Sequence, residues 1–176
     1  MRAPLFFALL VVSVTSLSRC TAQKPPTTQG MTTIYVVRHA EKLTSDFDTP
    51  LSPAGEQRAE ALAERLADAG VQQIYATTRQ RTQRTVGPLA TRLGLGPLVM
   101  EPGAVDSLVQ RIKRDDVGKT VLVAGHNNTV PQIVLGLSGQ AVAAIPETVF
   151  DHLFQVELRT NGEATVTVLQ YGAPTP

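Results

Sequence analysis

The octapeptide IYVVRHAE, residues 34–41, is an apolar and largely β-branched run that ends on an arginine, a histidine and a carboxylate. An apolar run of this length is typical of a strand buried within a parallel sheet. Arg38 and His39 would then lie at the carboxyl end of the strand, which is where open α/β sheets bind their ligands. The stretch therefore predicts an α/β fold and the place of a binding site.

Two further apolar runs end in polar residues. Residues 73–76 lead into Thr77 and then Arg81, and residues 120–124 lead into His126. Taken singly, a histidine or an arginine is as often structural as functional. Because the carboxyl ends of parallel strands share one edge of a sheet, we expect these side chains to converge with Arg38 and His39 on one site.

Strands alternate with helical patterns along the chain, which predicts a three-layer α/β/α sandwich with a mostly parallel sheet. Residues 153–158 and 164–169 alternate around Asn161-Gly162, a hairpin signal that predicts an antiparallel edge. The expected helices are residues 52–70 with Ser52 as the cap, residues 80–93 interrupted and bent at Gly87-Pro88, residues 104–114, and residues 129–137. A short strand at 98–100 completes the pattern.

The chain has 176 residues and a net charge of +1, which fits one globular domain with a proper core. Near-zero net charge gives no electrostatic footprint for nucleic acid. No apolar run after the N-terminal segment approaches transmembrane length. The domain is expected over residues 31–172, followed by a disordered tail at 173–176.

Residues 1–22 resemble an export signal, with a charged start at Arg2 and an apolar centre. Cleavage after Ala22 would release a periplasmic or secreted protein, whereas lipidation of Cys20 would anchor it to a membrane. In a third interpretation Met31 is the true start. Residues 23–30 are expected to form a flexible linker. Oligomeric state is left open by the sequence.

Four sequence blocks resemble the histidine phosphatase superfamily, whose fold is phosphoglycerate-mutase-like. Residues 38–41 are similar to its Arg-His-Gly-Glu signature, with alanine in place of glycine. Residues 48–52 resemble the next block, residues 75–78 with Arg81 the third, and Gly125-His126 the second histidine. The resemblance extends from about residue 31 to 172, so it covers essentially the whole expected domain.

The residues themselves suit phosphoryl transfer. Two arginines offer forked donors that match phosphate oxygens, and a neutral imidazole beside them can attack phosphorus. The resemblance implies the rest of the mechanism: His39 is the nucleophile, and Arg38, Arg81 and His126 bind the transferring group. No cofactor is implied. Arg84, one turn beyond Arg81, is expected to be a solvated surface residue.

Three alternatives stay open. His39, His126 and Glu41 could ligate zinc, although the neighbouring arginines make that electrostatically poor. The chain could also bind phosphate without turnover, or act as a phosphoglycerate-mutase-type phosphotransferase. The mutases carry helical insertions over the site, whereas residues 100–121 have room for one helix, so an open site and a phosphatase are favoured. The sequence leaves the substrate open among phosphorylated small molecules and phosphoproteins.

The proton donor to the leaving group is the least determined residue. Glu101 ends the third parallel strand, where the mutases of the superfamily place a catalytic glutamate. Glu41, Asp46 and Asp48 are competing donors. The acid-phosphatase branch has its carboxylate directly after the second histidine, where this chain has Asn127.

Overall fold

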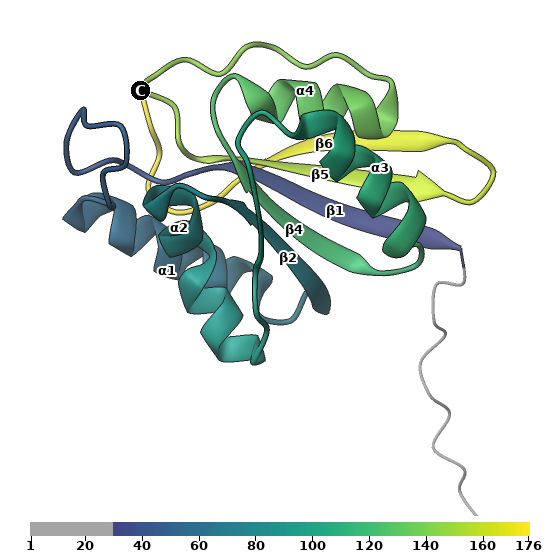
Figure 1. The fold of residues 1–176 in the computed structure, drawn as a ribbon, viewed down its shortest axis with the longest axis horizontal. Coiled ribbons are helices and arrows are strands. Elements are labelled where there is room, and N and C mark those ends of the chain that lie inside the picture. Colours follow the sequence, from purple (N-terminus) through teal and green to yellow (C-terminus); the bar gives the residue numbers. More distant parts are fainter. Residues whose placement is uncertain (1–29) are drawn as a thin grey trace, which may run out of the picture.

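Six strands form one sheet in the computed structural model, which describes residues 30–176. Their order across the sheet is β3-β2-β4-β1-β5-β6 (Figure 1). The four strands from β3 to β1 are mutually parallel, and β5 runs antiparallel to both of its neighbours. The strands are β1 (Met31–Arg38), β2 (Val71–Thr77), β3 (Leu98–Met100), β4 (Thr120–Gly125), β5 (His152–Arg159) and β6 (Ala164–Gln170).

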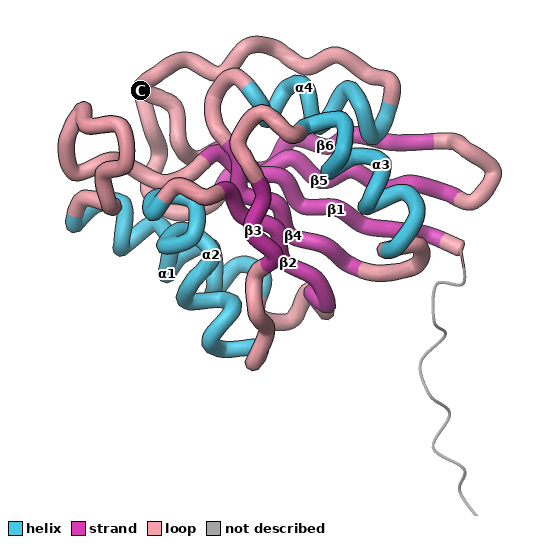
Figure 2. The backbone as a smooth tube through the Cα atoms, in the orientation of Figure 1, coloured by secondary structure: helices cyan, strands magenta, loops and turns pink. Residues whose placement is uncertain are grey.

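Helices cover both faces of this sheet (Figure 2). α1 (Pro53–Leu66) and α2 (Gln80–Leu93) pack on one face, and α3 (Val105–Asp115) and α4 (Thr129–Ser138) on the other. The prediction of a three-layer α/β/α sandwich with an antiparallel edge is confirmed. α2 runs through Pro88 as one helix, so the expected interruption does not end it.

Local chemistry explains where the elements start and stop. β1 and β4 lie inside the sheet. β4 is buried without a break from Val121 to Gly125, as a continuous apolar run requires, whereas Thr33 and Tyr35 of β1 are only partly buried. Ser52 caps α1 as predicted, because its hydroxyl oxygen accepts from the Gly55 amide at 3.1 Å. Gly94 ends α2 in the left-handed conformation, which glycine adopts without steric strain.

Two apolar clusters form the core, one on each face of the sheet. Leu62, Leu66 and Leu89 of α1 and α2 pack on one face, and Ile112 and Ile133 of α3 and α4 on the other. The sheet therefore fixes β1 and β4 between two buried layers. The loop that follows β1 is thereby anchored to a rigid base.

The two ends of the chain bear on four expectations. The export signal, the Cys20 anchor and the linker fall on residues 1–29 and so lie outside the described residues. Within residues 30–176, no helix is both long and apolar enough to cross a bilayer. Thr175 donates its hydroxyl to Asp151 at 2.6 Å and its amide at 3.2 Å. This contact differs from the disordered tail expected for residues 173–176, because a buried carboxylate binds the end of the chain.

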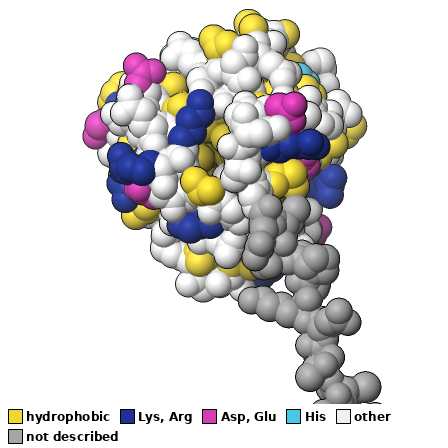
Figure 3. Space-filling view, turned by 90° about the vertical axis from the view of Figure 1, so that its right-hand side faces the viewer, with side chains coloured by type: hydrophobic (Ala, Val, Ile, Leu, Met, Phe, Trp, Pro, Cys, Tyr) yellow, Lys and Arg dark blue, Asp and Glu magenta, His cyan; other side chains and the backbone are white. Residues whose placement is uncertain are grey.

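Charge is mixed at the end of the molecule where β1 begins. Lys and Arg side chains are interspersed there with Asp and Glu side chains (Figure 3). Opposite charges at similar spacing largely cancel each other's field beyond a Debye length. A concentration of one charge sign occurs instead at the opposite end of β1, as described below.

Gly55 provides a test of how closely α1 packs against the segment that follows β1. A Cβ at Gly55 would overlap the carbonyl oxygen of Glu41, whereas a Cβ at Gly87 in α2 would meet nothing within 4 Å. Gly55→Ala should therefore lower the free energy of unfolding by about 1–3 kcal/mol, the usual range for overpacking. Gly87→Ala should change it by less than about 1 kcal/mol. Urea denaturation of both variants measures the contrast, and equal changes would contradict the close contact.

Candidate active site

The two histidines lie at the switch point of the sheet. β1 and β4 are neighbouring parallel strands, and the helices that follow them, α1 and α4, cover opposite faces. Ligands of open α/β sheets bind in the crevice outside the carboxyl ends of such a pair. His39 directly follows β1 and His126 directly follows β4. Their ring centroids are 5.4 Å apart, so the predicted convergence of these two residues is present in the structure.

His39 is held in one tautomer. Its Nδ1 lies 2.8 Å from the carbonyl oxygen of Ala40, and only 3% of the residue is exposed. Because a carbonyl oxygen only accepts, Nδ1 carries the proton and Nε2 keeps its lone pair. Burial, together with the charges of Arg38 and Arg81, lowers the pKa of His39 from 6.5 to about 3. The ring is therefore neutral at neutral pH, and the lone pair of Nε2 is available.

Arg38 is buried and anchored by one end of its guanidinium. Nη1 donates to the carbonyl oxygens of Pro146, Glu147 and Val149 at 2.8, 2.9 and 3.0 Å. Nη2 donates to the Glu147 carboxylate at 2.9 Å, and the guanidinium carbon lies 4.1 Å from the centre of the Phe150 ring. Nε is buried and has no partner. The contacts fix the arginine and leave a donor without an acceptor.

Arg81 lies in the first turn of α2 and reaches the same pocket. Nη1 donates to the carbonyl oxygen of Phe47 at 2.8 Å, and Nη2 lies 3.4 Å from His126 Nδ1. Its Nε is also buried without a partner. A buried donor without an acceptor costs roughly 1–3 kcal/mol. Arg38 and Arg81 thus each present an N–H group that an incoming anion could satisfy.

A line of hydroxyl groups orients His126. Its Nε2 lies 3.2 Å from the Thr77 hydroxyl, which lies 2.8 Å from the Thr82 hydroxyl. Thr82 gives its proton to a carbonyl, that of Arg79 at 2.8 Å or of Thr77 at 3.1 Å, so it accepts from Thr77. Thr77 must then accept from His126, which places the proton on Nε2 and the lone pair on Nδ1, towards Arg81. Burial, together with the charge of Arg81, lowers the pKa of His126 to about 4.

These side chains line an open pocket of about 290 Å³. That volume is near the lower end of the range for small-molecule sites, about 300–1,000 Å³. Four cationic side chains lie on its wall, those of Arg38, Lys42, Arg79 and Arg81. Among the described residues, Glu147 supplies the one carboxylate on that wall. The balance of charge favours an anionic ligand.

Several residues of the pocket wall were not identified from the sequence. Phe47 is 74% exposed at the rim, and the guanidinium carbon of Arg79 lies 3.6 Å from the centre of its ring. Lys42 and Arg79 directly adjoin predicted blocks, so their position in the sequence is a signal that could have found them. Glu147 has no such signal, because it lies in a long irregular segment between α4 and β5. Arg84 bonds to Glu56 at the surface, as expected of a solvated residue.

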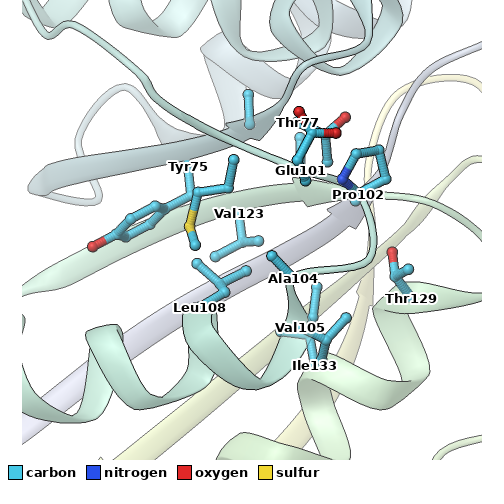
Figure 4. Close-up of a pocket in the computed structure, with 14 residues that line it drawn as sticks. Tyr75, Thr77, Glu101, Pro102, Ala104, Val105, Leu108, Val123, Thr129 and Ile133 are labelled. Atoms are coloured by element: carbon cyan, nitrogen blue, oxygen red, sulfur yellow. The ribbon is translucent and has the colours of Figure 1, made fainter.

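Glu101 is not among the residues that line this pocket. Its carboxylate accepts from the Thr78 hydroxyl at 3.3 Å, and the residue is among those that line a neighbouring apolar cavity under β2 and β4 (Figure 4). Pro102 and Gly103, which follow it, do reach the wall of the pocket. The structure therefore brings Arg38, His39, Arg81 and His126 together and leaves Glu101 beside them.

The three competing carboxylates are engaged elsewhere. Glu41 accepts two bonds from Arg58 Nε, at 2.9 and 3.0 Å, and one from Nη2 at 2.8 Å. Asp46 accepts from the Thr44 hydroxyl, and Asp48 accepts from the Gln80 amide at the start of α2. In the part of the chain from residue 30 onward, no three His, Cys, Asp or Glu side chains are grouped as metal ligands.

A family model described as "Histidine phosphatase superfamily (branch 1)" matches residues 34–104. Among curated proteins, "Probable phosphoglycerate mutase GpmB" of Cronobacter sakazakii is 27% identical over 124 residues, which is 66% of this chain and 53% of that protein. The protein of the same name from Enterobacter sp. is 33% identical over 79 residues, 41% of this chain and 36% of that one. The chain thus spans about half or less of the length of the curated relatives that it matches.

Solved structures share the fold at low sequence identity. "Structure of the protein histidine phosphatase SixA complexed with tungstate" has a TM-score of 0.62 and 20% identity, covering 78% of this chain and 96% of that one. A mycobacterial glucosyl-3-phosphoglycerate phosphatase has a TM-score of 0.63 and 16% identity, covering 81% and 100%. These likenesses support the phosphoglycerate-mutase-like fold predicted from the sequence.

The depressed pKa of His39 predicts how stability depends on pH. Below about pH 6.5 the unfolded chain binds a proton on this histidine, whereas the folded protein does not until about pH 3. The unfolded state therefore gains protons first, and the stability due to neutral His39 is lost as the pH falls from 6.5 towards 3. In His39→Gln, the free energy of unfolding should fall less between pH 6.5 and 4. Urea denaturation at several pH values tests this, and parallel curves for both proteins would contradict it.

Proposed function

Since the chain belongs to the histidine phosphatase superfamily, we propose that it hydrolyses phosphate monoesters through a phosphohistidine formed on His39. The observation that carries the proposal is the pair of buried, unpartnered Nε–H groups on Arg38 and Arg81. A phosphate dianion offers oxygens that can accept from both guanidinium groups. It would also neutralise the excess of positive charge on the pocket wall.

The proposed mechanism has two displacements. Nε2 of His39 attacks phosphorus, which forms an N–P bond as the bond to the leaving oxygen breaks. Arg38 and Arg81 stabilise the charge on the transferring oxygens. His126 lies with Nδ1 beside Arg81 and would contact the same group, donating a hydrogen bond once it is protonated. Water then attacks the phosphohistidine and releases inorganic phosphate.

A phosphatase is favoured over a mutase by the access to the pocket. Between β3 and β4 the described chain has one helix, α3, which packs against the far side of the apolar cavity and not over His39. Water can therefore reach a phosphohistidine. The SixA structure contains tungstate, a tetrahedral oxyanion, which supports the proposal of a phosphate pocket here. Phosphorylated small molecules and phosphoproteins are both compatible with an open pocket.

A covalent phosphoenzyme on His39 is the direct test of this function. Incubation with a phosphate ester followed by rapid quenching should give a phosphoenzyme that is labile in acid and stable in base. His39→Ala should yield none and lose turnover of p-nitrophenyl phosphate, while circular dichroism shows a folded protein. A chelator should leave wild-type turnover unchanged. Activity in folded His39→Ala would refute the nucleophile, and binding of phosphate without any turnover would favour the binding module.

Arg81 and His126, which together form the proposed phosphate clamp, have a matched control in Arg84 of α2. Arg81→Ala and His126→Ala should each lower kcat/KM by roughly a hundredfold or more, the scale of losing one transition-state donor. Arg84→Ala should change it much less, because Arg84 bonds to Glu56 at the surface. Steady-state kinetics on p-nitrophenyl phosphate measures all three. A larger loss in Arg84→Ala than in Arg81→Ala would show that the assignment of the clamp is wrong.

A further inference from the structure

Glu147 is the one carboxylate on the pocket wall among residues 30–176. It lies in the irregular segment after α4, 109 residues from Arg38, the β1 residue that it contacts, so no sequence block marks it. The carboxylates nominated from the sequence bond to groups outside the pocket, as described above. The position beside the histidines that a proton donor needs is therefore occupied by Glu147.

Two hydrogen bonds hold its carboxylate there. Oε2 accepts from Arg38 Nη2 at 2.9 Å, and Oε1 accepts from Asn127 Nδ2 at 2.7 Å. Asn127 directly follows His126, so the carboxyl group lies between the two strand ends that carry the histidines. The side chain is 73% exposed, which leaves room for a leaving group to approach it. The backbone of Glu147 is also bound to Arg38, which limits how far the residue can move.

Arg38 can bind Glu147 and a phosphate group together. Nη1 is directed at three carbonyl oxygens, and one Nη2 hydrogen serves Glu147. Nε–H and the second Nη2 hydrogen remain for the ligand. A phosphate dianion held by those donors would lie next to the carboxylate.

We propose that Glu147 is the proton donor to the leaving group, an assignment that rests on the proposed phosphatase function. As the bond from phosphorus to the leaving oxygen breaks, its electron pair stays on that oxygen and takes the proton of the Glu147 carboxyl group, which releases an alcohol. In the second step the Glu147 carboxylate takes a proton from the water that attacks the phosphohistidine. The electron pair of the N–P bond returns to His39 Nε2, and inorganic phosphate leaves.

The dependence of rate on the leaving group tests this role. Glu147→Gln keeps an oxygen that can accept from Arg38 or Asn127 but has no acidic proton. Its kcat/KM should fall by about a hundredfold on alkyl phosphates, and by much less on p-nitrophenyl phosphate, whose leaving group hardly needs protonation. Across a series of aryl and alkyl phosphates, the fall of kcat/KM with leaving-group pKa should be steeper than in the wild type. kcat/KM is the right quantity because it reports the steps up to phosphoenzyme formation.

Glu101→Gln is the matched rival variant and should keep the leaving-group dependence of the wild type. A steeper dependence in Glu101→Gln, with an unchanged one in Glu147→Gln, would move the role to Glu101 and overturn the assignment. An equal loss on every ester in Glu147→Gln would likewise overturn it, since that is what a purely structural contact with Arg38 gives. Wild-type protein that hydrolyses no ester and forms no phosphoenzyme would refute the proposed function itself.

Discussion

The parallel pairing of β1 with β4 is the constraint on which the site depends. The register sets Arg38 opposite Gly125, and the ladder continues one step further as the His39 amide donates to the Gly125 carbonyl at 2.9 Å. One residue beyond each strand is a histidine, so their separation is set by the spacing of neighbouring strands. A slip of one residue would turn each side chain to the other face of the sheet. The buried apolar faces of both strands exclude that slip, and so packing far from the pocket holds the two rings together.

Burial of the side chains explains the chemistry of the pocket as much as their convergence at one edge of the sheet does. Arg38 and both histidines are almost fully excluded from solvent. The same exclusion lowers the pKa of each histidine and leaves Nε of Arg38 unhydrated. In the free protein these groups oppose folding, because an unpaired donor and a buried charge both cost free energy. A ligand that satisfies them finds donors already oriented, with little reorganisation left to make.

The strands and helices could be predicted from the sequence, because its apolar runs alternate with amphipathic stretches, a pattern typical of strands that alternate with helices. It could also predict Arg38, His39, Arg81 and His126, since each lies at or just after the end of a recognisable element. It could not predict the rest of the wall. Glu147 and Phe47 lie in irregular segments whose path depends on tertiary contacts, and Pro88 sits in a helix that packing keeps continuous. Glu101 directly follows β3, but a strand of three residues does not determine where the side chain after it points.

The anchorage of Arg38 uses main-chain atoms of the loop before β5. Three carbonyl oxygens fix Nη1, and every amino acid supplies a carbonyl. Side chains of this loop other than that of Glu147 can therefore change while the guanidinium keeps its place, provided that the backbone follows the same path. Selectivity for one phosphorylated compound over another can diverge among descendants of this protein without the anion clamp having to be rebuilt.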